Sequence, residues 1–242
     1  CISIDENEMD LSALNLGMIA SYYYIKYSTI DLFAKSLSPT FKMKQILEIL
    51  CAATEFETIP IRHGEDKILK QLSTEITHKI EKPKFNEPDT KTNILLQCHF
   101  SRIPLSSDFI FDQKIILEKA AKLIPALVDV ISSSGYLRPA ILAMHLSQMI
   151  VQAMWINDSP LYQLPHFDKE LVNKCLAAKI EDIADLLNMD DEERLKLLNM
   201  TDSQLEDVAR VCNRYPSITM NFRVASEEIL SGETAIVEVN LE

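Results

Sequence analysis

Apolar residues recur at helical spacing through most of the first 165 residues. In 41–53, for example, Met43, Ile46, Leu47 and Leu50 share one side of a helix, because residues three and four apart lie on the same face. Seven segments carry this pattern: 11–25, 29–37, 41–53, 66–77, 90–101, 108–132 and 137–156. Polar joints containing Pro or Gly separate several of them. The pattern predicts a mostly α protein whose first domain, 1–165, is a seven-helix bundle.

Beyond Leu164-Pro165 the helical segments become shorter and the joints between them tighter. Four helices are predicted here: 168–178, 180–187, 190–198 and 202–213. Several begin with Asp or with Thr-Asp, whose side-chain oxygens accept hydrogen bonds from the free N–H groups of a first helical turn. Pro216 ends the run. We therefore expect a small helix-loop-helix domain over 166–216.

The last 26 residues, 217–242, change from helical spacing to alternation. Apolar and polar residues alternate over 217–224 and again over 234–241, on either side of a loop that contains Gly232. Two strands alone do not form a stable sheet. The segment is therefore interpreted as the first strands of a truncated β-sandwich. At the other end, the acidic segment 5–10 is interpreted as a linker or as the tail of a preceding domain.

Charge argues against a surface devoted to nucleic acid. The chain carries 24 basic and 36 acidic residues, a net charge of −12, whereas binding to phosphates requires Lys and Arg. The acidity is uneven: 16 basic and 19 acidic side chains give −3 over 1–165, 7 and 12 give −5 over 166–216, and 1 and 5 give −4 over 217–242. The C-terminal third is thus the more acidic part.

The sequence contains none of the usual catalytic or cofactor motifs. It has no Gly-rich phosphate loop and no hydrolase or metalloprotease motif, so we expect the chain alone neither to bind nor to hydrolyse ATP. Its five cysteines are scattered, which predicts no metal site and favours a reducing compartment. We predict no catalytic residue, no cofactor and no membrane span.

Two polar clusters allow a functional or a structural interpretation. His63 and Glu65 could act as an acid/base pair, but the run 62–66 also suits the turn that begins a helix, and this second interpretation is favoured. Tyr22, Tyr23 and Tyr24 could stack on bases. At about 100° per residue they cannot all face one ligand, so at least one is expected in the core.

The segment 112–131 combines a clean apolar stripe with a cationic side. The stripe consists of Ile116, Ala120, Leu123, Leu127 and Ile131. Lys119 and Lys122, three residues apart, share another side, and Pro125 removes one backbone hydrogen bond from the middle of the helix. The two lysines could belong to a solvated face or could face nucleic acid.

Six blocks of the sequence, in order along the chain, resemble the Sec-sixty-three unit that follows the helicase core in Ski-two-like superfamily-two helicases. The blocks are 14–25 (LNLGMIASYYYI), 59–66 (IPIRHGED), 91–102 (KTNILLQCHFSR), 148–155 (QMIVQAMW), 164–167 (LPHF) and 201–216 (TDSQLEDVARVCNRYP). The resemblance implies a helical bundle, a helix-loop-helix domain and an immunoglobulin-like sandwich. It also implies that 112–131 is a ratchet helix across a nucleic-acid channel, with Lys119 and Lys122 as strand-facing residues.

Within this family the blocks 59–66 and 148–155 are most similar to the C-terminal cassette of a spliceosomal RNA helicase, a pseudo-helicase that serves as a protein-docking platform. The resemblance implies a nuclear, non-catalytic accessory unit. Its expected partners are the motor and winged-helix domains of the same parent chain, other spliceosomal proteins and, weakly, RNA. The corresponding units of the activating-signal cointegrator helicase and of an endoplasmic-reticulum translocation factor are the alternatives.

Overall fold

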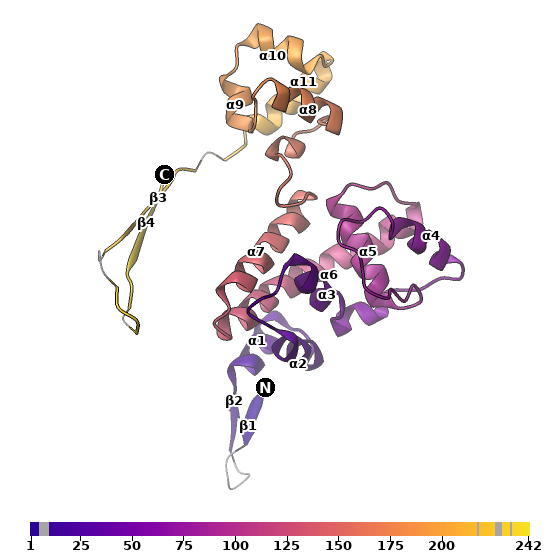
Figure 1. Cartoon of the computed structure of the whole chain (residues 1–242), viewed down its shortest axis with the longest axis vertical. Coiled ribbons are helices and arrows are strands. Elements are labelled where there is room, and N and C mark those ends of the chain that lie inside the picture. Colours follow the sequence, from indigo (N-terminus) through magenta and orange to yellow (C-terminus); the bar gives the residue numbers. More distant parts are fainter. Residues whose placement is uncertain (5–9, 217, 226–228, 233) are drawn as a thin grey trace. The chain divides into compact units, whose positions relative to one another are not determined.

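The computed structural model describes residues 1–4, 10–216, 218–225, 229–232 and 234–242. The chain separates into two compact units, Cys1–Asp158 and Ser159–Glu242 (Figure 1). Ser217, at the start of the first predicted strand, and 5–9, most of the predicted linker, lie outside the described residues. The three-part division at 165 and 216 stays a prediction.

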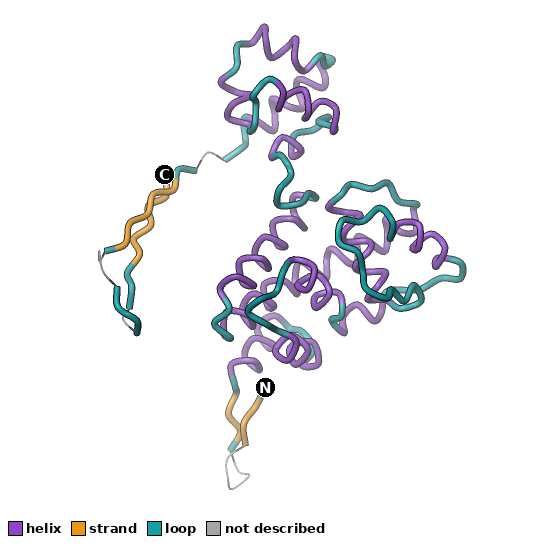
Figure 2. The backbone as a smooth tube through the Cα atoms, in the orientation of Figure 1, coloured by secondary structure: helices purple, strands orange, loops and turns teal. Residues whose placement is uncertain are grey.

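The first unit contains the seven predicted helices, which confirms the mostly α fold (Figure 2). They are α1 (Asn15–Tyr23), α2 (Tyr27–Ser36), α3 (Met43–Cys51), α4 (Glu65–Leu72), α5 (Pro88–Phe100), α6 (Ser107–Ser133) and α7 (Leu137–Gln152), with a 3₁₀ turn η1 (Thr54–Thr58) after α3. Helix α5 is buried over most of its length, including the polar residues Lys91, Asn93 and Gln97. A helix buried on all sides lies inside the bundle and must pair its polar groups there.

The start of the chain differs from the prediction, because Leu11–Ala13 is a strand and not the first turn of a helix. Strand β2 (Leu11–Ala13) pairs antiparallel with β1 (Ile2–Ile4) in a hairpin that projects from the bundle (Figure 1). The Leu14 N–H donates to the Cys1 carbonyl oxygen at 2.9 Å, and a Cβ on Gly17 would lie 2.1 Å from the same oxygen. Glycine in α1 therefore permits the approach of the N-terminal strand.

Helices α6 and α7 are joined by a tight turn in which Gly135 has a φ of +74°.

Polar contacts also hold the C-terminal end of α5. The Trp155 indole N–H donates to the Ser101 hydroxyl at 2.8 Å, and the Arg102 Nε donates to the Ala153 carbonyl oxygen at 2.9 Å. These bonds tie the C-terminal end of α5 to the segment that follows α7.

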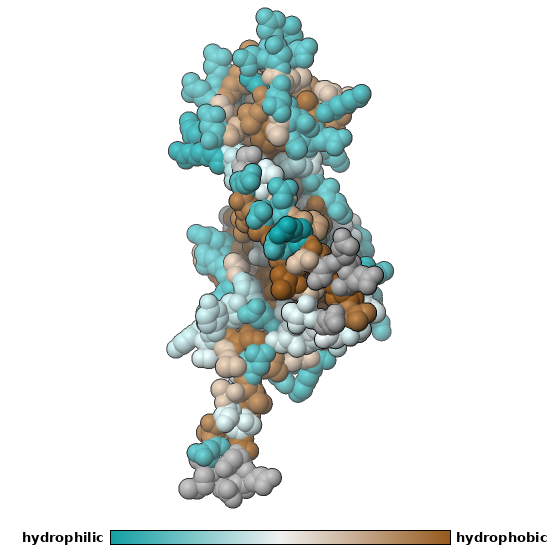
Figure 3. Space-filling view, turned by 90° about the vertical axis from the view of Figure 1, so that its left-hand side faces the viewer, coloured by the Kyte–Doolittle hydropathy of each residue, from teal (hydrophilic) through white to brown (hydrophobic). Residues whose placement is uncertain are grey.

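The second unit begins with a 3₁₀ turn, η2 (Pro160–Gln163), and continues with four short helices. These are α8 (Lys169–Ala177), α9 (Ile183–Asn188), α10 (Asp191–Leu198) and α11 (Asp202–Cys212). Side chains cap them: Asp168, Asp182, Asp190 and Thr201 each accept a backbone N–H from the first turn. The caps of α8, α10 and α11 stand where acidic or Thr-Asp starts were predicted, whereas α9 was expected to begin at 180. On the face shown in Figure 3, hydrophilic side chains cover much of these helices.

The chain ends in an antiparallel hairpin of β3 (Met220–Val224) and β4 (Val237–Leu241), where alternation predicted strands. Phe222 lies opposite Val239, and all residues of both strands are exposed. The expectation that this hairpin opens a larger sandwich stays a prediction.

Candidate functional site

The structure places the predicted apolar stripe of α6 in the core. Ile116, Ala120, Leu123, Leu127 and Ile131 are all buried. The helix continues without a break from Ser107 to Ser133 and includes Pro125. The two lysines that were predicted to face nucleic acid therefore sit on a helix whose opposite side is fixed by packing.

Lys119 and Lys122 lie in different surroundings although they are three residues apart. The half-buried Lys119 ammonium donates to the Glu55 carbonyl oxygen at 2.6 Å and to the Thr58 hydroxyl, so it joins α6 to η1. Burial, and next the positive charge of Lys26, lower the pKa of Lys119. Lys119 is thus engaged within the bundle, and a neighbouring cation lies close to it.

Lys122 is exposed, and its ammonium lies 5.9 Å from the centre of the Tyr24 ring, within cation–π range. Tyr24 follows the last turn of α1 and is itself exposed. Of the three consecutive tyrosines, Tyr23 is the one that turns inward: its hydroxyl donates to the Asp129 carboxylate at 2.8 Å. That hydrogen bond, together with burial, raises the pKa of Tyr23 to about 12.

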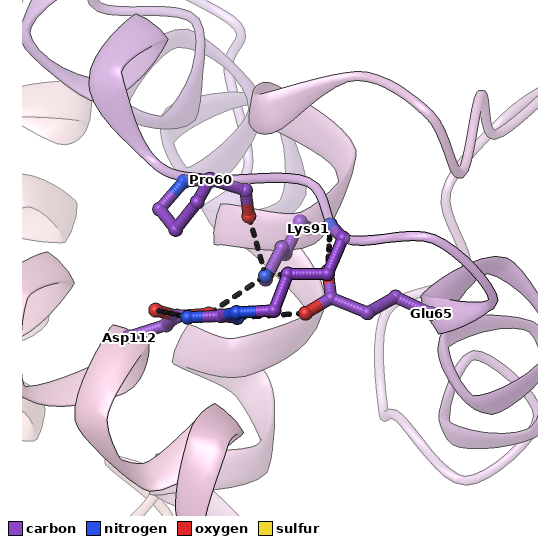
Figure 4. A network of polar contacts seen from close by, with 5 residues as sticks. Pro60, Glu65, Lys91 and Asp112 are labelled. Atoms are coloured by element: carbon purple, nitrogen blue, oxygen red, sulfur yellow. Dashed lines mark hydrogen bonds and ion pairs between the residues drawn. The ribbon is translucent and has the colours of Figure 1, made fainter.

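A buried network of charged side chains joins α4, α5 and α6 in the first unit (Figure 4). The Lys91 ammonium, wholly buried, donates to the Pro60 carbonyl oxygen at 2.6 Å and to Glu65 and Asp112 at 2.7 Å each. Arg62 donates to Glu65 at 2.7 Å and bridges both oxygens of Asp112 at 2.5 and 2.9 Å. Two cations and two anions therefore balance: Lys91, Glu65 and Asp112 are buried, whereas the Arg62 side chain is 38% exposed.

The network holds both of its carboxylates ionised. Burial on its own would raise the pKa of Glu65 and of Asp112, but the hydrogen bonds from Lys91 and Arg62 outweigh it, and both pKa values are lowered. The same contacts raise the pKa of Arg62, with the Asp112 hydrogen bond as the largest cause. All three donor positions of Lys91 are used, so this arrangement has the features of a structural joint and not of an acid/base pair.

The turn interpretation of 62–66 is confirmed. Gly64, with a φ of +83°, precedes the first residue of α4, and Glu65 turns into the network while His63 is exposed. The sequence reasoning missed Lys91 and Asp112. A signal for Asp112 was present, because it stands four residues before Ile116 on the apolar stripe of α6, where a carboxylate requires a buried partner.

The described residues contain neither a candidate metal site nor a helix that could span a membrane. Within the ranges that the structure covers, no group of three or more His, Cys, Asp or Glu side chains is arranged to hold a metal ion. None of the described helices combines the length and the apolar character needed to cross a membrane.

Comparison with protein families defines the class to which this fold and these sequence blocks correspond. The family model of the Sec63 Brl domain matches residues 13–242, and the chain belongs to this family. The chain is 52% identical over its whole length to the U5 small nuclear ribonucleoprotein 200 kDa helicase of Homo sapiens. It is 49% identical to the DExH-box ATP-dependent RNA helicase DExH12 of Arabidopsis thaliana and 46% identical to the activating signal cointegrator 1 complex subunit 3-like protein of Dictyostelium discoideum.

The chain spans 11% of the length of each of these three relatives. The family match and the identity to helicase relatives confirm the likeness to the Sec-sixty-three unit of a spliceosomal helicase, which the sequence blocks predicted.

Proposed function

We propose that this chain is a non-catalytic accessory unit of a nuclear, spliceosomal ATP-dependent RNA helicase, and that it corresponds to the C-terminal cassette of that helicase. Its main role is to dock proteins, and α6 is a vestigial ratchet helix that contacts RNA weakly. Support comes from the family, from relatives named as U5 small nuclear ribonucleoprotein helicases, and from the absence of any phosphate-binding loop in the sequence.

The docking role rests on one observation, the hydrogen bonds that the Lys119 ammonium forms within the bundle. The ammonium is bound to Glu55 and Thr58, so α6 offers Lys122 and not a pair of lysines to a passing strand. Each lysine–phosphate contact adds about one unit to the salt dependence of binding, so a single lysine supplies little affinity. A net charge of −12 opposes tight RNA binding further.

The expected partners are the motor and winged-helix domains of the parent chain and other spliceosomal proteins. The test is capture of named spliceosomal proteins from ribonuclease-treated nuclear extract by the 242-residue chain. We expect capture to survive the ribonuclease and the substitution Lys122→Glu. Lys114→Glu, an exposed lysine on the same helix, is the matched control.

Capture that disappears with ribonuclease, or with Lys122→Glu but not with Lys114→Glu, would show that RNA contact and not protein docking dominates.

One relative, 46% identical, is named as a cointegrator complex subunit, and its class is the second candidate. Recovery of cointegrator proteins in place of spliceosomal proteins would favour that class.

A further inference from the structure

We propose that Tyr24, with Lys122 and Lys26 beside it, forms a subsite on which one base of a single-stranded RNA stacks. The subsite lies where the end of α1 meets α6. It rests on the proposed weak RNA contact of α6 and extends that contact to a residue of another helix.

Tyr24 occupies an unusual backbone position for an aromatic residue. Tyr24 is 87% exposed although its backbone adopts the left-handed conformation, with φ 58° and ψ 47°, at the C-terminal end of α1. Glycine or asparagine usually occupies that position, because a side chain costs free energy there. Here the position carries a large, exposed aromatic ring, and the Lys122 ammonium lies 5.9 Å from the centre of that ring.

A hollow lies beside the ring. The depression, of about 540 Å³, is lined by Tyr24, Lys26 and Tyr27, by residues of α1 and by Cys1, Ile2 and Ala13 at the start of the chain. Its size and mostly apolar lining suit a nucleobase, and both tyrosines are exposed. Base stacking on an aromatic ring requires such an open apolar face beside the phosphate contacts.

Two exposed lysines supply positive charge beside the ring. Lys26 and Lys122 come from two segments that meet here, and neither forms an ion pair with a carboxylate in the part of the chain that the structure describes. Lys26 donates to the Thr54 carbonyl oxygen, and the nearby Glu55 carboxylate is occupied by the Lys26 backbone N–H and by Thr29. The Glu55 charge acts on Lys119 and offsets part of the positive charge, but Lys26 and Lys122 are exposed. Two exposed cations beside an aromatic ring favour a polyanion over an acidic or neutral peptide.

The experiment measures binding of a fluorescent single-stranded RNA and of an abasic strand of the same length to the 242-residue chain at low salt. The abasic strand keeps the phosphates and removes stacking. We expect Tyr24→Ala to weaken RNA binding by about fivefold or more, the loss of one stacked base, and to leave binding of the abasic strand unchanged. Tyr24→Phe, which keeps the ring, should bind like the wild type.

Tyr22→Ala is the matched control. Tyr22, in α1, is 81% exposed, but its ring packs edge-on against the Tyr23 ring, with 4.9 Å between the ring centres. The subsite would be overturned if Tyr24→Ala and Tyr22→Ala lowered the RNA affinity equally, or if Tyr24→Ala lowered the affinity for the abasic strand as much as for the RNA. Either result would leave the docking role intact. Wild-type protein that binds no RNA at low salt would also overturn the subsite. Failure of the docking role would be seen separately, as ribonuclease-sensitive capture of proteins.

Discussion

Asp112 shows how one residue sets the geometry of the bundle. It has no exposed side-chain surface, and it accepts hydrogen bonds from Lys91 of α5 and from Arg62 in the turn before α4. Removing one member of such a network leaves another charge buried and unpaired, which is more costly than loss of the bond itself. Without the Asp112 charge, Lys91 and Arg62 would share the single carboxylate of Glu65, and one positive charge of the network would lack a counterion.

Asp112→Asn should therefore lower the free energy of unfolding by about 3–5 kcal/mol. Urea unfolding followed by circular dichroism measures it. Asp108→Asn, an exposed position in the first turn of the same helix, is the control and should cost less than about 1 kcal/mol. Similar losses in the two variants would mean that the buried network does not stabilise the bundle.

The same network predicts how stability depends on pH. The pKa values of Glu65 and Asp112 are lowered in the folded state from ordinary values of 4.5 and 3.8. Their contribution is therefore fully present above those ordinary values and is lost as the pH falls through the lower, folded values. The free energy of unfolding should decline below about pH 4.5, and Asp112→Asn should flatten the decline. A decline of equal slope in both proteins would rule out Asp112 as its source.

Among the elements, the helices with strong periodicity were predictable and the first strand was not. The stripe of α6 and the Asp and Thr caps of α8, α10 and α11 are local signals, and the structure shows them where the sequence placed them. Strand β2 depends instead on pairing with β1, a contact between segments that no local pattern encodes. The same reason explains the site: spacing placed Lys119 and Lys122 on one side of a helix, but the partner that engages Lys119 comes from residues 55–58.

Gly17→Ala tests the packing of the N-terminal strand against α1. In a helix interior, alanine normally stabilises the fold by about 0.5–1 kcal/mol relative to glycine. Here the Cβ of alanine would lie 2.1 Å from the Cys1 carbonyl oxygen. We expect the strand to shift and the Leu14 amide, bonded to that oxygen, to exchange its hydrogen faster. Hydrogen exchange measures this, with the α5 amides as the internal reference. Unchanged protection of Leu14 would contradict the close contact.

At the scale of the whole molecule, the described chain forms two units with separate apolar cores. Among the described residues neither core contains a recognisable catalytic constellation, and the buried charged groups of the first unit, Lys91, Glu65 and Asp112, are occupied in joining helices. What remains for partners is surface: acidic helices in the second unit, and a small cationic and aromatic area where α1 meets α6. That distribution is the physical basis for proposing protein docking with a minor RNA contact.

The affinity of the 242-residue chain for single-stranded RNA at physiological salt tests this proposal most directly. Fluorescence anisotropy with the wild type and with Lys122→Glu would measure it. If protein docking is the main role, the Kd for RNA should lie well above about 1 µM, in the range of non-specific electrostatic binding, and Lys122→Glu should weaken RNA binding further. A sub-micromolar Kd that Lys122→Glu abolishes would contradict this role and would identify α6 as a working ratchet.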